Sequence, residues 1–476
     1  MESDSQGAIG GLAANRPLLI LVLFGFGLAA LAAAGFLRAP ETAASGMRLL
    51  DFSISLAIAL AVPHALAALA PRRGVGRWAT AAAIAAAFIV AFALLAGAPP
   101  LQLGGVSLHA ASFLAGAALF GLMIAGRPLI GGLAGFGLAG PVAAIIGAVS
   151  AAALLSLEDV SAPHVIGAVA TMSASFAALV SVGVAADFAN AFARGGDSHF
   201  AAGVAAHRAA APAFNAALNV LCVFAAGLLP AAEMLDWSWR MIFFAAGGGV
   251  VAASTALFFS AATLSLGVVT EEAASIENHR RQRFRRWWRP VRDLLPTSSA
   301  LAFVAILMIL AIVAQFETYQ PISLIKVGLI VGCAAAAALT YVSLRTGLFV
   351  MAALFFAMVL ADWGYVLFGV AAPALTAQLT ALACLAALFA QVAASWRDAR
   401  SPRRKAREAT EAAMIDGAYR YVASAAFAIA AFAAAAMSGL WSDAGAAGAY
   451  YALLASMGAV FAAPLMTAIG AMFGRD

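Results

Sequence analysis

Long apolar segments recur along the whole chain and constrain its fold more than any other feature. Each holds about 20 residues with few charges, the length that a helix needs to cross the hydrocarbon core of a bilayer. The chain is 64% hydrophobic and 10% charged. A soluble fold would have to bury most of these segments in one core, which 476 residues cannot do. We therefore predict an all-α polytopic membrane protein.

Apolar length and the positions of charged residues predict about 14 transmembrane helices. They cover residues 17–37, 50–70, 78–96, 110–125, 130–157, 165–193, 211–229, 241–269, 301–316, 322–344, 348–368, 375–395, 421–440 and 450–472. We expect no cleavable signal peptide, because the first apolar run begins after Arg16 and lacks a convincing cleavage site.

The positions of Lys and Arg predict the orientation, because these residues collect in cytoplasmic loops. With the N-terminus inside, all 27 Lys and Arg residues fall on the cytoplasmic side except Arg38, Arg48, Arg240 and Lys326. We expect a multi-pass protein of a bacterial-type inner (cytoplasmic) membrane, with both termini in the cytoplasm.

A basic segment, residues 271–297, divides the chain near its middle. This segment is rich in arginine and contains two tryptophans, and it follows the end of a predicted span. That combination is typical of an amphipathic helix on an anionic inner leaflet. The candidate lipid-headgroup residues are Arg280, Arg281, Arg283, Arg285, Arg286, Trp287, Trp288 and Arg289. Nucleic-acid binding would need a folded reader or a long exposed basic arm, and neither is present. We expect membrane lipids, and no nucleic acid, as partners.

The halves on either side of this linker follow the same order of spans and loops. Each begins after an arginine group, holds six predicted spans, and has a lone arginine after its second span, Arg127 or Arg345. Because six is even, both halves enter from the cytoplasm and form two parallel six-helix repeats. The predicted domains are an N-terminal transmembrane helix pair (1–71), a first six-helix repeat (72–270), a cytoplasmic basic amphipathic linker helix (271–297) and a second six-helix repeat (298–476).

Asp187 is a carboxylate well inside an apolar span. An ionisable group at membrane depth is costly, so its presence predicts a role such as proton coupling. Asp187, Asn190 and Arg194 also share one helical face, which equally allows a locally neutralised, structural polar stripe. Asn215 and Asn219 on the next span are candidates to complete a buried hydrogen-bonding patch with Asp187.

The repeat, the linker and one motif together resemble the resistance-nodulation-division (RND) superfamily of proton-driven exporters. In its lipid-exporting branch, which includes MMPL and hopanoid transporters, the fourth span carries G-x-x-x-D-[YF]-A. This chain has Gly183, Asp187, Phe188 and Ala189 at those places. The resemblance covers the chain from about Arg72 onward, and it implies proton coupling at Asp187.

The chain departs from this family in two respects. Gln391 is the only polar side chain where the family has a second carboxylate or basic partner, so it joins Asp187, Asn190, Asn215 and Asn219 as a proton-coupling candidate. Only short loops stand in place of the large extracytoplasmic porter domains.

Three classes of function follow. The resemblance implies a degenerate RND-type transporter that moves lipid or another hydrophobic molecule with proton coupling. One alternative is a non-transporting membrane subunit that assembles with protein partners. The other is a membrane sensor similar to the multi-span MHYT input domains, although the Met-His-Tyr-Thr ligands are missing. The sequence shows no catalytic, cofactor or metal-ligand pattern, so we expect no enzyme, cofactor or metal site.

Overall fold

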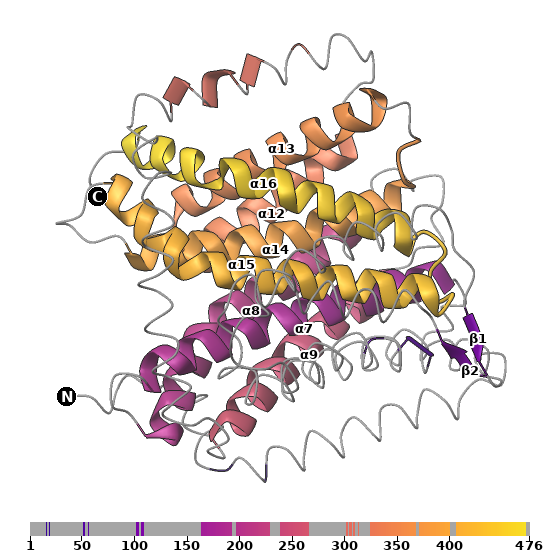
Figure 1. Ribbon diagram of the computed structural model, residues 1–476, viewed down its shortest axis with the longest axis horizontal. Helices are drawn as coiled ribbons and strands as arrows, with labels where there is room; N and C mark the ends of the chain where they lie inside the picture. Colours follow the sequence, from indigo (N-terminus) through magenta and orange to yellow (C-terminus); the bar gives the residue numbers. More distant parts are fainter. Residues whose placement is uncertain are drawn as a thin grey trace, which may run out of the picture. The chain divides into compact units, whose positions relative to one another are not determined.

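The computed structural model describes residues 163–192, 197–228, 239–265, 324–367, 371–399 and 406–472, two short strands between 101 and 108, and a few single residues elsewhere. Within these ranges the chain is helical apart from one hairpin (Figure 1). The helices are α7 (Pro163–Phe192), α8 (Ser198–Leu228), α9 (Trp239–Ser265), α12 (Leu324–Tyr341), α13 (Leu344–Leu367), α14 (Leu375–Ala399), α15 (Ala406–Met437) and α16 (Ala444–Met472).

Each of these helices overlaps a predicted span in the same part of the chain. Six of the described helices, all but α9 and α15, are long and apolar enough to cross a membrane. This supports the prediction of a membrane protein. The earlier spans, the span 301–316, the helix pair 1–71 and the linker 271–297 lie almost wholly outside the described residues, so the number 14 stays a prediction.

Helix α8 begins 13 residues before the predicted span 211–229. The carboxylate of Asp197 accepts hydrogen bonds from the backbone N–H groups of His199 and Phe200, at 2.5 and 3.2 Å. These are the second and third residues of the helix, so Asp197 is its N-cap. The helix therefore starts in the polar stretch and continues into the apolar one.

The strands β1 (Leu101–Leu103) and β2 (Val106–Leu108) form an antiparallel hairpin in which Leu101 lies opposite Leu108. The prediction has a loop between two spans at this place, so the hairpin lies outside the predicted helices and the all-α class stands.

The described helices belong to two compact units. The first unit contains α7, α8 as far as Ala217, α9, α15 from Val422, and α16 as far as Ala449. The second unit contains the rest of α8, the whole of α12, α13 and α14, and the remaining parts of α15 and α16. The predicted repeats join at the linker 271–297, outside the described residues, and stay a prediction.

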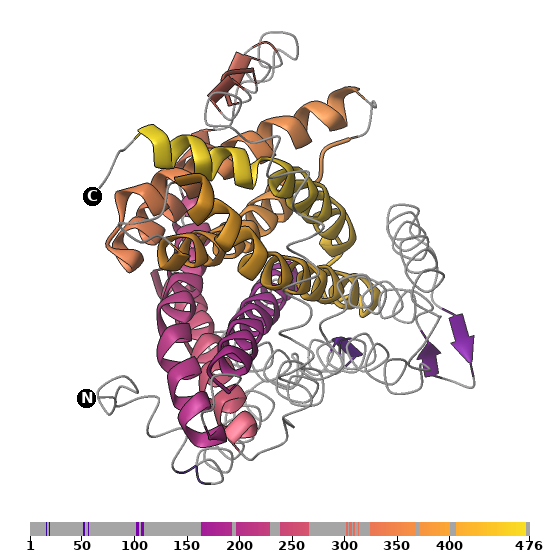
Figure 2. The ribbon, with the colours of Figure 1, turned by 60° about the vertical axis from the view of Figure 1, so that its left-hand side comes forward.

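In the first unit, α7 packs along α9 (Figure 1, Figure 2). The hydroxyl of Ser260 on α9 donates a 2.8 Å hydrogen bond to the hydroxyl of Ser181 on α7. Gly167, near the start of α7, lies so close to the turn before α16 that a Cβ there would stand 2.5 Å from the Cβ of Trp441. Only glycine permits this approach.

In the second unit, α12, α13 and α14 pack against one another. The ring of Phe389 on α14 is fully buried, 5.9 Å from the ring of Phe349 on α13 and 6.2 Å from that of Tyr421 on α15. Gly458 on α16 leaves space for this ring, because a Cβ at Gly458 would lie 2.2 Å from the Cζ of Phe389. The Tyr421 hydroxyl donates a hydrogen bond to the carbonyl of Ala455. These contacts attach α15 and α16 to the three-helix bundle.

The turn between α12 and α13 places a valine in an unfavourable backbone conformation. Val342 has a φ of 47°. Its N–H donates to the carbonyl of Leu339 at 3.3 Å, and the N–H of Ser343 donates to the carbonyl of Ala338 at 3.0 Å. This pattern is a Schellman motif, in which glycine usually occupies the left-handed position.

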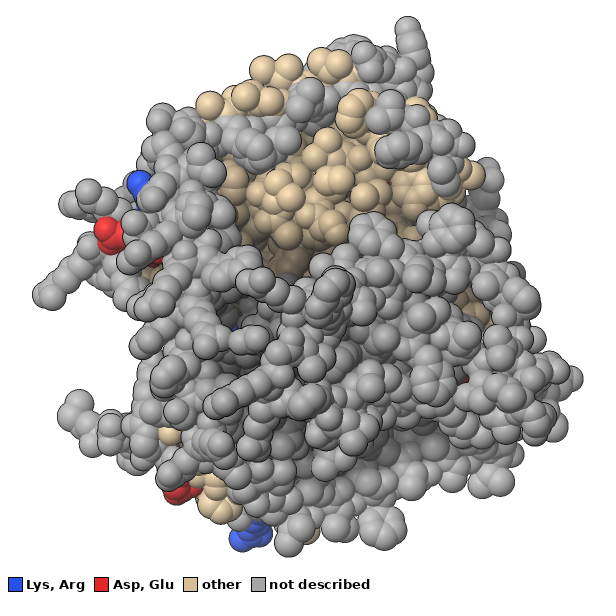
Figure 3. Space-filling model, in the orientation of Figure 1, with Lys and Arg blue, Asp and Glu red and all other residues tan. Residues whose placement is uncertain are grey.

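Part of the described surface of the second unit is apolar. Figure 3 has the orientation of Figure 1. In the area of α13 and α16 its described surface is tan, without the blue of Lys and Arg or the red of Asp and Glu. Several large apolar side chains on these helices are exposed, among them Met351, Val366 and Val460. Such a surface suits contact with lipid chains.

Candidate functional sites

Asp187 is buried near the end of α7, with 6% of its surface exposed. Its Oδ1 lies 3.9 Å from Nη1 of Arg208 on α8, whose side chain is 48% exposed. This separation is an ion pair but is too long for a direct hydrogen bond. The carboxylate is therefore held inside the unit, while its cationic partner reaches out of it.

The direction of α8 explains why Arg208 reaches Asp187. Side chains on a helix lean toward its N-terminus, and α8 starts directly after the connection that follows α7. Arg208 therefore extends toward the end of α7 at which Asp187 lies. The predicted partner Arg194 lies outside the described residues, so the proposed stripe of Asp187, Asn190 and Arg194 is not tested.

The other proton-coupling candidates lie in three helices. Asn190 is partly exposed in α7, one turn after Asp187. Asn215 and Asn219 are both almost fully buried, four residues apart on α8. Gln391 is buried in α14 of the second unit. Each of these four residues interacts with other residues of the protein.

The candidate lipid-headgroup residues of the linker lie outside the described residues. They are Arg280, Arg281, Arg283, Arg285, Arg286, Trp287, Trp288 and Arg289. Their role on the inner leaflet stays a prediction.

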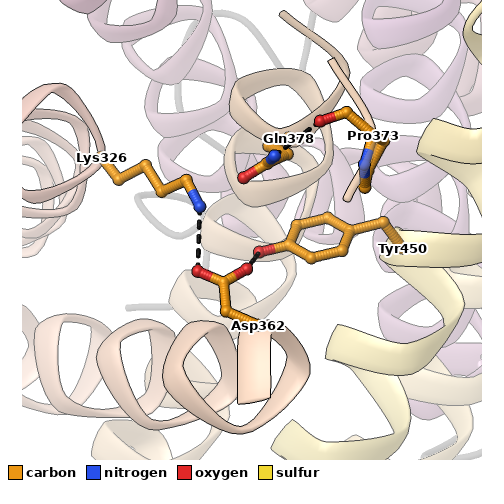
Figure 4. A network of polar contacts seen from close by, with 5 residues as sticks. All are labelled: Lys326, Asp362, Pro373, Gln378 and Tyr450. Carbon is orange, nitrogen blue, oxygen red and sulfur yellow. Dashed lines mark hydrogen bonds and ion pairs between the residues drawn. The ribbon is translucent and has the colours of Figure 1, made fainter. Parts of the chain in front are cut away.

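The second unit holds a polar network that sequence reasoning missed (Figure 4). Nζ of Lys326, at the start of α12, lies 2.9 Å from Oδ2 of Asp362, near the end of α13. The hydroxyl of Tyr450, near the start of α16, donates a 2.8 Å hydrogen bond to Oδ1 of the same carboxylate. A lysine ammonium, a carboxylate and a phenol hydroxyl, each from a different apolar helix, thus form one cluster.

The sequence did contain a signal for this cluster. Lys326 and Asp362 have opposite charges, and each lies inside a predicted span rather than in a loop. Both also lie toward the predicted outer side. Charged residues inside spans usually pair with one another. The orientation rule alone makes Lys326 an exception and predicts no role for Asp362.

Comparison of the chain with protein-family models, with curated proteins and with solved structures gives no match. Within the described ranges, no three His, Cys, Asp or Glu side chains come together as a metal site. The chemistry of the two charged sites therefore has to be argued from their own geometry.

Proposed function

We propose that the protein is a multi-pass carrier of an inner (cytoplasmic) membrane, with both termini in the cytoplasm, that moves lipid or another hydrophobic molecule with proton coupling at Asp187. The observation that carries this proposal is a buried carboxylate inside a long apolar helix, 3.9 Å from the guanidinium of a half-exposed arginine. The G-x-x-x-D-[YF]-A motif around Asp187 and the six long apolar helices also support it.

The proposed coupling step is a change of charge at the α7–α8 contact. With Asp187 ionised, its attraction to Arg208 favours the arrangement of α7 and α8 in which the two side chains face each other. A proton on Asp187 removes that attraction and leaves a neutral acid, which is far less costly in an apolar environment. Protonation therefore changes the relative free energies of two arrangements of α7 and α8, as a coupling site requires.

Lipid movement in reconstituted vesicles tests the proposal. The probe is a phosphatidylethanolamine with a fluorescent headgroup, and a membrane-impermeant reductant quenches only the outer leaflet. We expect the wild-type protein to move the probe faster when a pH gradient is imposed. We expect Asp187→Asn to lose this gradient-dependent part, because the amide cannot take up a proton.

Asp197→Asn is the matched control. It makes the same chemical change at an exposed position, and asparagine is an equally good N-cap for α8. This variant should behave as the wild type does. Equal movement by wild type and Asp187→Asn, with or without the gradient, would contradict the proposal.

Purification in mild detergent separates transport from the alternative of a non-transporting subunit. A stoichiometric protein partner that co-purifies with the wild type and with Asp187→Asn alike would favour the subunit. In that case Asp187 and Arg208 form a structural ion pair.

A further inference from the structure

The Lys326–Asp362 cluster lies at one end of the second unit because of the directions of its helices. Helices α12 and α13 form a hairpin, so the start of α12 and the end of α13 lie at the same end. Lys326 is the third residue of α12, and Asp362 is five residues before the end of α13. Tyr450 near the start of α16 reaches the same carboxylate.

The cluster holds a singly charged cation in a partly buried site. The side chain of Lys326 is 12% exposed and that of Asp362 is 30% exposed. One carboxylate oxygen binds the ammonium, and the other accepts the Tyr450 hydroxyl. The ammonium is the only cation for which a contact with this carboxylate is described.

Gln378, near the start of α14, has an unused side-chain oxygen and is drawn beside this cluster in Figure 4. Its Nε2 donates a 2.6 Å hydrogen bond to the carbonyl of Pro373, and its Oε1 is buried without a hydrogen-bond partner. Figure 4 shows this oxygen pointing to the side of the network on which Lys326 lies. A buried acceptor without a partner is costly and calls for an explanation, such as an ion that the site binds.

We propose that Asp362, Tyr450 and Gln378 form a binding site for a monovalent alkali cation, and that the ammonium of Lys326 is a tethered competitor for it. The three side chains offer hard oxygen ligands: a carboxylate, a hydroxyl and an amide carbonyl. A single carboxylate balances a single positive charge, which favours a monovalent ion over a divalent one. This inference is independent of the role proposed for Asp187.

The exchange conserves charge and needs no proton transfer. As the alkali cation enters, the ammonium of Lys326 leaves, and one positive charge stays beside Asp362. Tyr450 keeps its proton and turns its oxygen lone pair toward the cation. Because Lys326 is at the beginning of its helix, its flexible stem can carry the ammonium to the polar membrane surface.

Chemical labelling of the wild-type protein tests the exchange directly. The sequence contains only two lysines, Lys326 and Lys405, so an amine-reactive ester followed by mass spectrometry reads Lys326 with Lys405 as an internal reference. We expect labelling of Lys326 relative to Lys405 to rise several-fold in sodium chloride over choline chloride at equal ionic strength. Equal labelling in the two salts would overturn the proposal.

Gln378→Leu isolates the contribution of the unused oxygen. The variant keeps Lys326, Asp362 and Tyr450 and removes Oε1, so we expect its labelling of Lys326 to become insensitive to sodium. A sodium effect of unchanged size in this variant would overturn the assignment of Gln378 as a ligand.

Lys326→Met provides a second readout. Removal of the competitor leaves the Asp362 carboxylate without its cation, and we expect the thermal unfolding temperature in detergent to fall. Sodium should restore it, whereas choline should not. The double variant Lys326→Met with Asp362→Asn should show no sodium effect. Rescue of Lys326→Met by methylammonium but not by sodium would show that the site binds ammonium groups only, and the proposal would fall.

Discussion

The guanidinium of Arg397, at the end of α14, donates a 2.7 Å hydrogen bond from Nη1 to the carbonyl oxygen of Tyr341, at the end of α12. The last carbonyls of a helix have no partner within it, and a cation there also complements the helix dipole. The bond therefore joins the ends of two helices that are 56 residues apart.

We expect Arg397→Met to lower the free energy of unfolding by about 1 kcal/mol, because a charged hydrogen bond is lost at a partly exposed place. Arg397→Lys keeps the charge near the helix end but loses the planar guanidinium, so its loss should be smaller. Thermal unfolding of the purified protein in detergent measures both. Wild-type stability of the Met variant would show that the bond contributes nothing.

Val342→Gly should stabilise the protein. Val342 has a positive φ, and 92% of its surface is exposed, so little packing is lost with its side chain. Relief of the left-handed strain minus the extra freedom of glycine in the unfolded chain leaves a gain of about 0.5–1 kcal/mol. Val342→Ala is the control, since alanine retains the Cβ that causes the strain. A higher unfolding temperature for the alanine variant alone would refute this account.

Gly458→Ala should destabilise the second unit. The new Cβ would meet the Phe389 ring, which is already enclosed by Phe349 and Tyr421. Overpacking of this kind typically costs about 1–3 kcal/mol. Gly364→Ala is the matched control, because a Cβ at that helical glycine meets nothing within 4 Å.

The double variant Gly458→Ala with Phe389→Leu checks the cause of this loss. It should be more stable than the sum of the two single changes, because the smaller side chain makes room for the new methyl group. Strict additivity would mean that the ring and the glycine do not compete for the same space.

The Asp187–Arg208 pair should contribute little to stability. Its atoms are 3.9 Å apart and the arginine is half exposed, so a double-mutant cycle with Asp187→Asn and Arg208→Met should give a coupling energy below about 1 kcal/mol. Denaturant or thermal unfolding in detergent provides the four stabilities. A coupling energy above about 2 kcal/mol would assign Asp187 a structural role instead.

Apolar length predicted where the described helices lie, but not where α8 and α15 begin. The predicted spans begin only after the polar residues that precede them. The helices α8 and α15 include those polar residues and begin earlier, at Ser198 and Ala406. Hydropathy predicts which part of a helix is apolar enough to lie in a membrane. The start of the helix depends on capping, and Asp197 is the signal that was available for α8.

Neither charged site could be assembled from the sequence alone. The prediction for Asp187 has a charged partner, Arg194, on the same helix, because spacing along one helix can be read from sequence, and only the uncharged Asn215 and Asn219 on the next span. The pairing with Arg208, and that of Lys326 with Asp362, depends on how separate helices pack. The sequence shows that such charges need partners. It does not show which helix supplies them.

Pro212 follows Arg208 by four residues on α8 and has no N–H to donate to the carbonyl of Arg208. The helix therefore has its weakest point one turn beyond the arginine that pairs with Asp187. From Pro212 to Leu228 the helix is about 24 Å long. A bend of about 10° at the proline would move the far end sideways by about 4 Å. Helix α8 can therefore bend one turn after the arginine whose side chain reaches the carboxylate that we propose takes up the proton.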